Sequence, residues 1–153
     1  MKNFNLSEIE KCLGIKFSNP TYILVALTHS SYAKQFRGEE YNERLEFLGD
    51  SVLQLTITEY LFKKFKSKTE GELTKIRSLI VCENSLCEIS KKLKLSSFIR
   101  MSRGEELTGG RERVSIQADA VEAVIAAIYL DKGLEVAKNF ILTNFENIII
   151  KAI

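Results

Sequence analysis

Residues 42–55, with the sequence NERLEFLGDSVLQL, constrain the fold of this chain more than any other stretch. If they form a helix that turns about 100° per residue, then Glu43, Glu46 and Asp50 lie within roughly 60° of one another and make one acidic stripe. Most other positions are apolar, including Phe47 beside the acids, so the helix is apolar almost all the way round. The pattern therefore predicts a buried helix that carries carboxylates.

Carboxylates on a buried helix need compensation, because like charges about 4 Å apart repel by roughly 4 kcal/mol at the effective dielectric near a protein surface. A hard divalent cation is the simplest partner, and ligands that are all oxygen favour Mg²⁺ or Mn²⁺ over zinc. The alternative is an exposed acidic face that pairs with Arg44 or with lysines. The apolar flanks of this helix and a second acidic block further along the chain favour the cation.

The second acidic block contains Asp119 and Glu122, which are three residues apart and so share one helical face. Ala123 and Ala126 lie near that face, and their small side chains would let another helix approach closely. Taken alone, the block also fits a solvated helix face. Packed together, the two blocks would form a four-carboxylate cluster that an ordinary core would not accept without cations, and its members would be Glu46, Asp50, Asp119 and Glu122.

Two segments carry a resemblance to a known family, NERLEFLGDS at 42–51 and QADAVEAVIAAIYLD at 117–131. They are similar to the two signature blocks of bacterial ribonuclease III, the double-stranded-RNA endonuclease, and they occur in the same order. The likeness extends over nearly the whole chain, beginning at LTHS in 27–30. It implies the all-α bundle of the endonuclease domain.

The resemblance also implies a chemistry, the Mg²⁺-dependent hydrolysis of phosphodiester bonds in double-stranded RNA, with Mn²⁺ as a possible substitute and no organic cofactor. Mg²⁺ held by carboxylates lowers the pKa of a bound water and neutralises charge on the attacked phosphate, so a side-chain nucleophile is unnecessary. The positions that match the family's metal ligands are Glu46, Asp119 and Glu122, the catalytic positions are Asp50 and Glu122, and two further acids of the cleavage valley are Glu43 and Glu70.

Phe47 lies among the acids and, with Leu53, gives the helix more apolar surface than one small domain is expected to cover. Burial in the domain's own core is the alternative. The family is a symmetric homodimer in which the position of Phe47 plugs into the partner. Such a twofold arrangement would place one acidic cluster on each strand of a duplex, which is how the family leaves short 3′ overhangs.

Basic residues next to the acidic blocks are candidates for contact with the RNA backbone, which must be held while metals act on one phosphate. Double-stranded RNA is recognised mainly by shape and by its 2′-hydroxyls, so no base-reading motif is expected. A solvated face is the alternative for each basic cluster. The candidates closest in sequence to the acids are Lys75, Arg77, Arg111 and Arg113.

His29 is the only histidine, which excludes sites that need a histidine pair, such as a His-rich zinc site or a di-iron bundle. A lone general base is possible in principle. We expect instead a hydrogen-bonded structural residue, because the resembling family assigns this position no catalytic role. The three cysteines lack the spacing of a zinc site and are expected to be reduced thiols without function.

At 153 residues, with 45% hydrophobic and 27% charged residues, the chain is expected to be one domain over 1–153. A net charge of +2 is too small to argue for a polyanion partner. The N-terminus does not resemble a signal peptide and no segment has the length of a membrane span, so we expect a cytoplasmic protein that binds no membrane. Nothing corresponds to the double-stranded-RNA-binding domain of ribonuclease III, so the chain is either an excised catalytic domain or similar to shorter relatives that lack it.

Helical periodicity and capping patterns predict the elements, and no segment alternates like a strand. Ser7 with Glu10 resembles a capping box, and Asn19-Pro20 opens a second helix. The acidic helix is expected to continue to about residue 64. A second capping box opens a helix at Thr69, and further helices are expected over 84–93, 115–130 and 134–149, with a glycine-rich mobile loop over 100–114.

The sequence thus predicts an all-α, dimeric, Mg²⁺-dependent endonuclease that cuts double-stranded RNA. By resemblance, its expected work is the processing of ribosomal, messenger and other structured precursor RNAs. One competing hypothesis is a non-catalytic domain that binds duplex RNA on the same fold, although all the matched acids are present. The other is an unrelated carboxylate-rich metal-binding bundle, which the single histidine disfavours.

Overall fold

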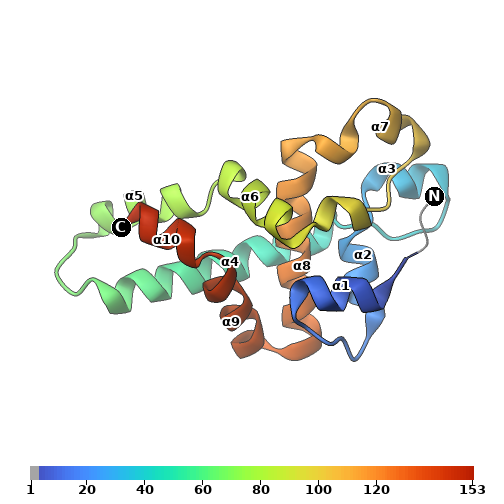
Figure 1. Ribbon diagram of the computed structural model, residues 1–153. Helices are drawn as coiled ribbons and strands as arrows, with labels where there is room; N and C mark the ends of the chain where they lie inside the picture. Colours follow the sequence, from blue (N-terminus) through green and yellow to red (C-terminus); the bar gives the residue numbers. More distant parts are fainter. Residues whose placement is uncertain (1–3) are drawn as a thin grey trace.

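The computed structural model describes residues 4–153, and over this range the regular structure is helical (Figure 1). One isolated parallel bridge joins Thr28 to Arg100. None of the helices over 4–153 is both long and apolar enough to cross a bilayer. In chain order the elements are α1 (Leu6–Leu13), α2 (Pro20–Ala26), α3 (Ser30–Gln35), α4 (Glu43–Lys64), α5 (Glu70–Ile80), α6 (Glu83–Leu93), η1 (Leu95–Phe98), α7 (Arg103–Leu107), η2 (Gly110–Glu112), α8 (Val114–Lys132), α9 (Leu134–Asn144) and α10 (Glu146–Ala152).

Two long helices, α4 and α8, form the centre of the fold and cross each other (Figure 1). The middle of α8 is buried continuously from Ile116 to Ile128, except for the half-buried Asp119, because α4, α6, α2 and α9 all pack against it. Alanine is frequent along this segment, and small side chains let the surrounding helices approach closely. The acids of both sequence blocks are therefore carried by the two central helices.

The acidic helix extends to Lys64, as predicted, but the prediction that it is buried all round was wrong for one face. In the single chain Phe47 is 80% exposed and Phe62 is 69% exposed, and the side chain of Leu55 on the same face is also exposed. These positions are eight and seven residues apart, which places them within about 80° on a helix. An apolar stripe of α4 thus faces away from the core.

Several helix starts follow the predicted capping patterns. Asn19 caps α2 through its side chain, with Pro20 in the first turn. At α5 both bonds of the predicted capping box are present: the Thr69 hydroxyl accepts the Glu72 N–H at 3.2 Å, and the Glu72 carboxylate accepts the Thr69 N–H at 3.0 Å. The predicted box at Ser7 was wrong, because Asn5 caps α1.

Three further differences are local. The short helices α3 and η1 were not predicted, because six and four residues are too few for a periodic pattern. The segment 100–114 was expected to be a mobile loop but contains α7 and η2, which side-chain hydrogen bonds join to their surroundings. The predicted final helix is divided into α9 and α10 at the fully buried Phe145, and α10 turns to pack on α5.

Candidate metal centre

The carboxylates of α4 and α8 meet where the two helices cross. One oxygen from each of Glu46, Asp119 and Glu122 lies within 4.8 Å of the other two. Asp50, one turn after Glu46 on α4, hydrogen-bonds to Glu122. The convergence predicted from two blocks about 70 residues apart is therefore confirmed.

Gly49 makes this crossing possible, although no role was predicted for it. A Cβ atom at Gly49 would lie 1.7 Å from the carbonyl oxygen of Glu122 and 2.6 Å from its carbonyl carbon. No side chain fits there unless the helices move apart. The glycine between Glu46 and Asp50 thus lets the backbone of α4 approach the backbone that carries Glu122.

Glu122 is the most deeply buried acid of the cluster, with 9% of its surface exposed. Burial raises its pKa to about 9, and the hydrogen bond to Asp50 and the charges of Asp50, Glu46 and Asp119 add to the effect. In the absence of a cation, Glu122 therefore holds a proton at neutral pH. A buried carboxyl group that is protonated without metal can become a metal ligand, because a bound cation takes the place of the proton.

Glu46 and Asp119 show the same electrostatic conflict. Burial raises the pKa of Glu46 to about 7, and the charge of Asp119 and a hydrogen bond to it add to the rise. Burial also raises the pKa of Asp119. Three oxygen ligands that repel one another at this spacing fit a hard divalent cation, which would remove the repulsion.

The two further acids that were predicted to line a cleavage valley lie at opposite ends of α4. Glu43 is the first residue of α4, and its negative charge helps to raise the pKa of both Glu46 and Asp119. Glu70 begins α5, beyond the C-terminal end of α4. Since the 22 residues of α4 span about 33 Å, a single chain does not bring Glu70 to the cluster (Figure 1).

Two more residues near the cluster were not predicted. Glu83, at the start of α6, adds a negative charge that raises the pKa of Asp119. Asn42 is buried, and it anchors the start of α4: its side-chain amide donates to the Ala26 carbonyl at 3.1 Å and its backbone N–H to the Thr28 carbonyl at 2.9 Å. No spacing rule links Glu83 to the acidic blocks, so only the tertiary structure identifies it.

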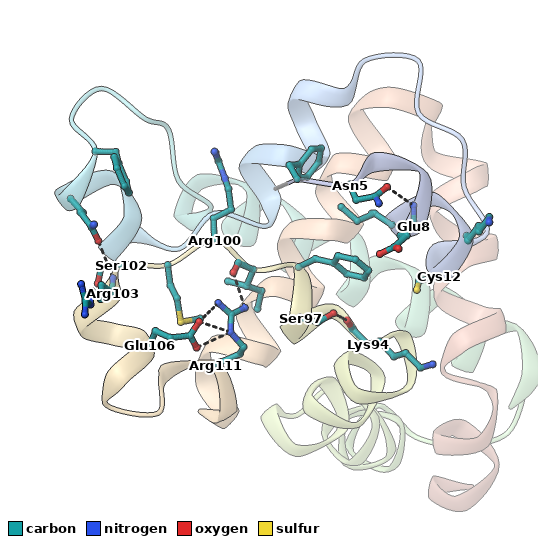
Figure 2. Close-up of a pocket in the computed structure, with 18 residues that line it drawn as sticks. Asn5, Glu8, Cys12, Lys94, Ser97, Arg100, Ser102, Arg103, Glu106 and Arg111 are labelled. Carbon is teal, nitrogen blue, oxygen red and sulfur yellow. Dashed lines mark hydrogen bonds and ion pairs between the residues drawn. The ribbon is translucent and has the colours of Figure 1, made fainter. Parts of the chain in front are cut away.

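Of the basic residues predicted to contact RNA, Arg111 is committed to the protein itself. Its guanidinium donates to both carboxylate oxygens of Glu106, and also to the carbonyls of Ser96 at 2.5 Å and Ile99 at 2.8 Å, as Figure 2 shows in part. The bonds to the two carbonyls hold η2 against η1 and the residue that follows it. The structure therefore argues against Arg111 as a free RNA contact and indicates a structural role.

The other three basic candidates are more accessible. Arg113 forms an ion pair with Glu105 and donates to the Thr108 carbonyl, and its side chain remains partly exposed. On α5, Lys75 is exposed and Arg77 donates to the Thr58 hydroxyl at 2.9 Å. Whether these three contact RNA stays a prediction.

A cavity of about 890 Å³ lies apart from the acids, between α1 and the segment 97–103 (Figure 2). Its lining includes Phe98, Arg100 and Met101 but none of the four carboxylates of the cluster. The candidate metal centre is therefore not inside this cavity.

Comparisons with known proteins agree with this geometry. A family described as Ribonuclease-III-like matches residues 19–149. Proteins named Ribonuclease 3 from Clostridium perfringens and Clostridium beijerinckii are 68% and 69% identical over all 153 residues. The chain spans 65% and 66% of the length of these two relatives.

Solved structures show the same fold. The nuclease domain of ribonuclease III from Campylobacter jejuni superposes with a TM-score of 0.87 at 45% identity, over 94% of this chain and 97% of that one. That structure is described for flexibility in a region involved in dimer formation. Dicer from Giardia intestinalis shares the fold alone, with a TM-score of 0.66 at 24% identity over 91% of this chain and 18% of Dicer.

Proposed function

Since the chain belongs to the ribonuclease-III-like family, we propose that it is the nuclease domain of a metal-dependent endoribonuclease that hydrolyses phosphodiester bonds in double-stranded RNA. The observation that supports this most is the convergence of Glu46, Asp119 and Glu122 at one point. Their raised pKa values indicate that the site is incomplete without a cation.

In this proposal Mg²⁺ is the natural ion and Mn²⁺ a substitute, because the donor set is all carboxylate oxygen. Glu46, Asp119 and Glu122 hold the ion. When bound, it supplies a water of lowered pKa and neutralises charge on the attacked phosphate. Asp50 hydrogen-bonds to protonated Glu122 in the metal-free chain. Once a cation displaces that proton, the Asp50 carboxylate beside the cluster is free to accept a proton from water there.

We further propose that the protein acts as a homodimer. The exposed apolar stripe on α4, with Phe47 at its N-terminal end, is a surface that a monomer would leave in water. A second copy on this stripe would place two acidic clusters along one RNA duplex, one for each strand. In such a dimer, Glu70 of one subunit is free to approach the acids of the other.

A cleavage assay tests the proposed activity. A radiolabelled RNA duplex is incubated with the chain, with and without Mg²⁺, beside the variant Glu122→Gln. We expect cleavage only with the metal and a loss of at least about a hundredfold in the variant, because an amide cannot replace a charged ligand at the metal centre.

The same assay distinguishes the nuclease from the competing hypothesis of a non-catalytic RNA-binding domain. A non-catalytic domain for duplex RNA would bind the labelled duplex but would not cleave it at any Mg²⁺ or Mn²⁺ concentration. This result would refute the nuclease proposal. The expected natural substrates are structured precursors of ribosomal and messenger RNA, and tests with such transcripts follow once cleavage is established.

A further inference from the structure

His29 precedes α3 and caps it through its ring. The residue has extended backbone angles, and its Nδ1 accepts the backbone N–H of Ser31 at 3.2 Å. This contact agrees with the structural role expected for the only histidine in the chain. The contact involves Nδ1, and the second ring nitrogen, Nε2, takes no part in it.

The hydrogen bonds around Ser31 determine where the imidazole carries its proton. The Ser31 hydroxyl oxygen accepts the backbone N–H of Ser102 at 2.9 Å, so its own proton is free to point at Nδ1 of His29, 2.8 Å away. Both neighbours of Nδ1 are therefore donors. A neutral ring with Nδ1 as an acceptor carries its proton on Nε2.

Backbone hydrogen bonds and electrostatics connect this ring to the acidic cluster. Its backbone N–H donates to the Arg100 carbonyl at 2.9 Å, and the preceding residue, Thr28, accepts the N–H of Asn42, which immediately precedes Glu43. Negative charges of Asp119 and Glu43, together with that of Glu105, act on the ring. Among residues 4–153, the hydrogen bonds of the ring involve Nδ1, and none is made by Nε2.

We propose that His29 is a substrate-contacting residue, whose Nε2–H donates a hydrogen bond to a non-bridging phosphate oxygen of the RNA strand at the metal centre. This inference rests on the proposed function. An acidic cluster repels the phosphates of its substrate, so an unused donor beside it offers the phosphate a favourable contact. The ring does not act as a general base in this arrangement, because Nε2 is protonated and the Nδ1 lone pair is already engaged.

The electrostatics agree with a neutral donor. Burial lowers the pKa of His29 below its ordinary value, although the charges of Glu105, Asp119 and Glu43 oppose the shift. A neutral imidazole donates to a phosphate without adding a positive charge that would compete with the cation for the acids.

Two matched variants separate the two ring nitrogens. In His29→Asn, the side-chain oxygen can take over the role of Nδ1, since asparagine is among the best helix caps, but the Nε2 donor is lost. In His29→Gln, the amide nitrogen can approach the position of Nε2. Both variants are compared with the wild-type chain for thermal midpoint, Mg²⁺ affinity by calorimetry and single-turnover cleavage of an RNA duplex. Duplex affinity is measured separately with Glu122→Gln present, where cleavage does not interfere.

We expect His29→Asn to keep the thermal midpoint and the Mg²⁺ affinity while cleavage slows about ten- to a hundredfold, the range for a hydrogen bond to a charged group. Duplex affinity should fall as well, and His29→Gln should recover part of both. The inference is overturned if His29→Asn cleaves at the wild-type rate, or if its Mg²⁺ affinity falls in step with cleavage, which would mean that the ring supports the acids. A wild-type chain that does not cleave duplex RNA with Mg²⁺ would instead refute the proposed function itself, and with it this contact.

Discussion

At the scale of single residues, Glu122 connects the candidate metal centre to the pH dependence of stability. Its pKa is about 9 in the folded chain against 4.5 for an unperturbed glutamate. Between these values the unfolded chain releases a proton that the folded chain keeps, so the unfolding free energy falls as pH rises from about 4.5 to about 9. Below this window Glu122 does not change the unfolding free energy with pH, because it is protonated in both states.

We therefore expect the thermal midpoint of the metal-free protein to fall between pH 5 and pH 8, and to fall less in Glu122→Gln, which cannot ionise. Thermal denaturation in EDTA over this pH range measures both slopes. Added Mg²⁺ should stabilise the wild-type chain most at the alkaline end, where less work is needed to remove the proton from Glu122. Equal slopes for the two proteins would show that Glu122 does not hold the proton.

Gly49 is the second critical residue, because its missing side chain permits the crossing of α4 and α8. We expect Gly49→Ala to lower the unfolding free energy by about 1–3 kcal/mol and to reduce Mg²⁺ affinity, since the backbone at Glu122 must move away from the new methyl group. Urea denaturation and calorimetry measure the two effects.

Gly71 provides the matched control. A Cβ there would meet only the Thr69 hydroxyl oxygen at 4.0 Å, and the position is helical. Gly71→Ala should therefore be neutral or stabilising by about 0.5–1 kcal/mol, with Mg²⁺ affinity unchanged. If the two alanine variants behave alike, the close approach at Gly49 does not matter for the site.

At the scale of elements, the end of α8 is joined to the segment before α2 by one carboxylate. Asp131, whose side chain is 3% exposed, accepts the backbone N–H groups of Ser18 and Asn19, each at 2.8 Å. We expect Asp131→Ala to cost about 1.5–3 kcal/mol, because two donors lose a charged acceptor. Asp131→Asn keeps one acceptor and should lose less. Denaturant titration of both variants tests this order, and an equal loss in both would contradict it.

At the scale of the whole molecule, the apolar stripe on α4 predicts self-association. We expect light scattering to report a dimer at micromolar concentration and Phe47→Ala to weaken it by at least about tenfold, the effect of truncating a central aromatic anchor. Leu107, which is 76% exposed on α7 and lies off the stripe, supplies the control variant Leu107→Ala. A monomeric wild-type chain, or equal weakening by both variants, would contradict the proposed dimer.

The sequence predicted the two acidic faces that meet at the candidate metal centre, because their acids occur at helical spacing. Glu46 with Asp50, and Asp119 with Glu122, each share a helix face that local geometry alone determines. The capping box at Thr69 was predictable for the same reason, since it involves residues three apart. The structural bonds of Arg111 were not predictable in this way, because the carbonyls of Ser96 and Ile99 lie more than ten residues away.

Local spacing therefore determined the all-α class, the limits of the longer helices α4, α5, α6 and α8, and the two acidic faces, because each depends on interactions within one or two turns. Only the tertiary structure decided that α4 and α8 cross at Gly49, that one face of α4 stays exposed, and that Glu83 and His29 lie near the acids. The physical reason is that these features depend on contacts between segments tens of residues apart, and side-chain packing selects those contacts without leaving a periodic pattern in the chain.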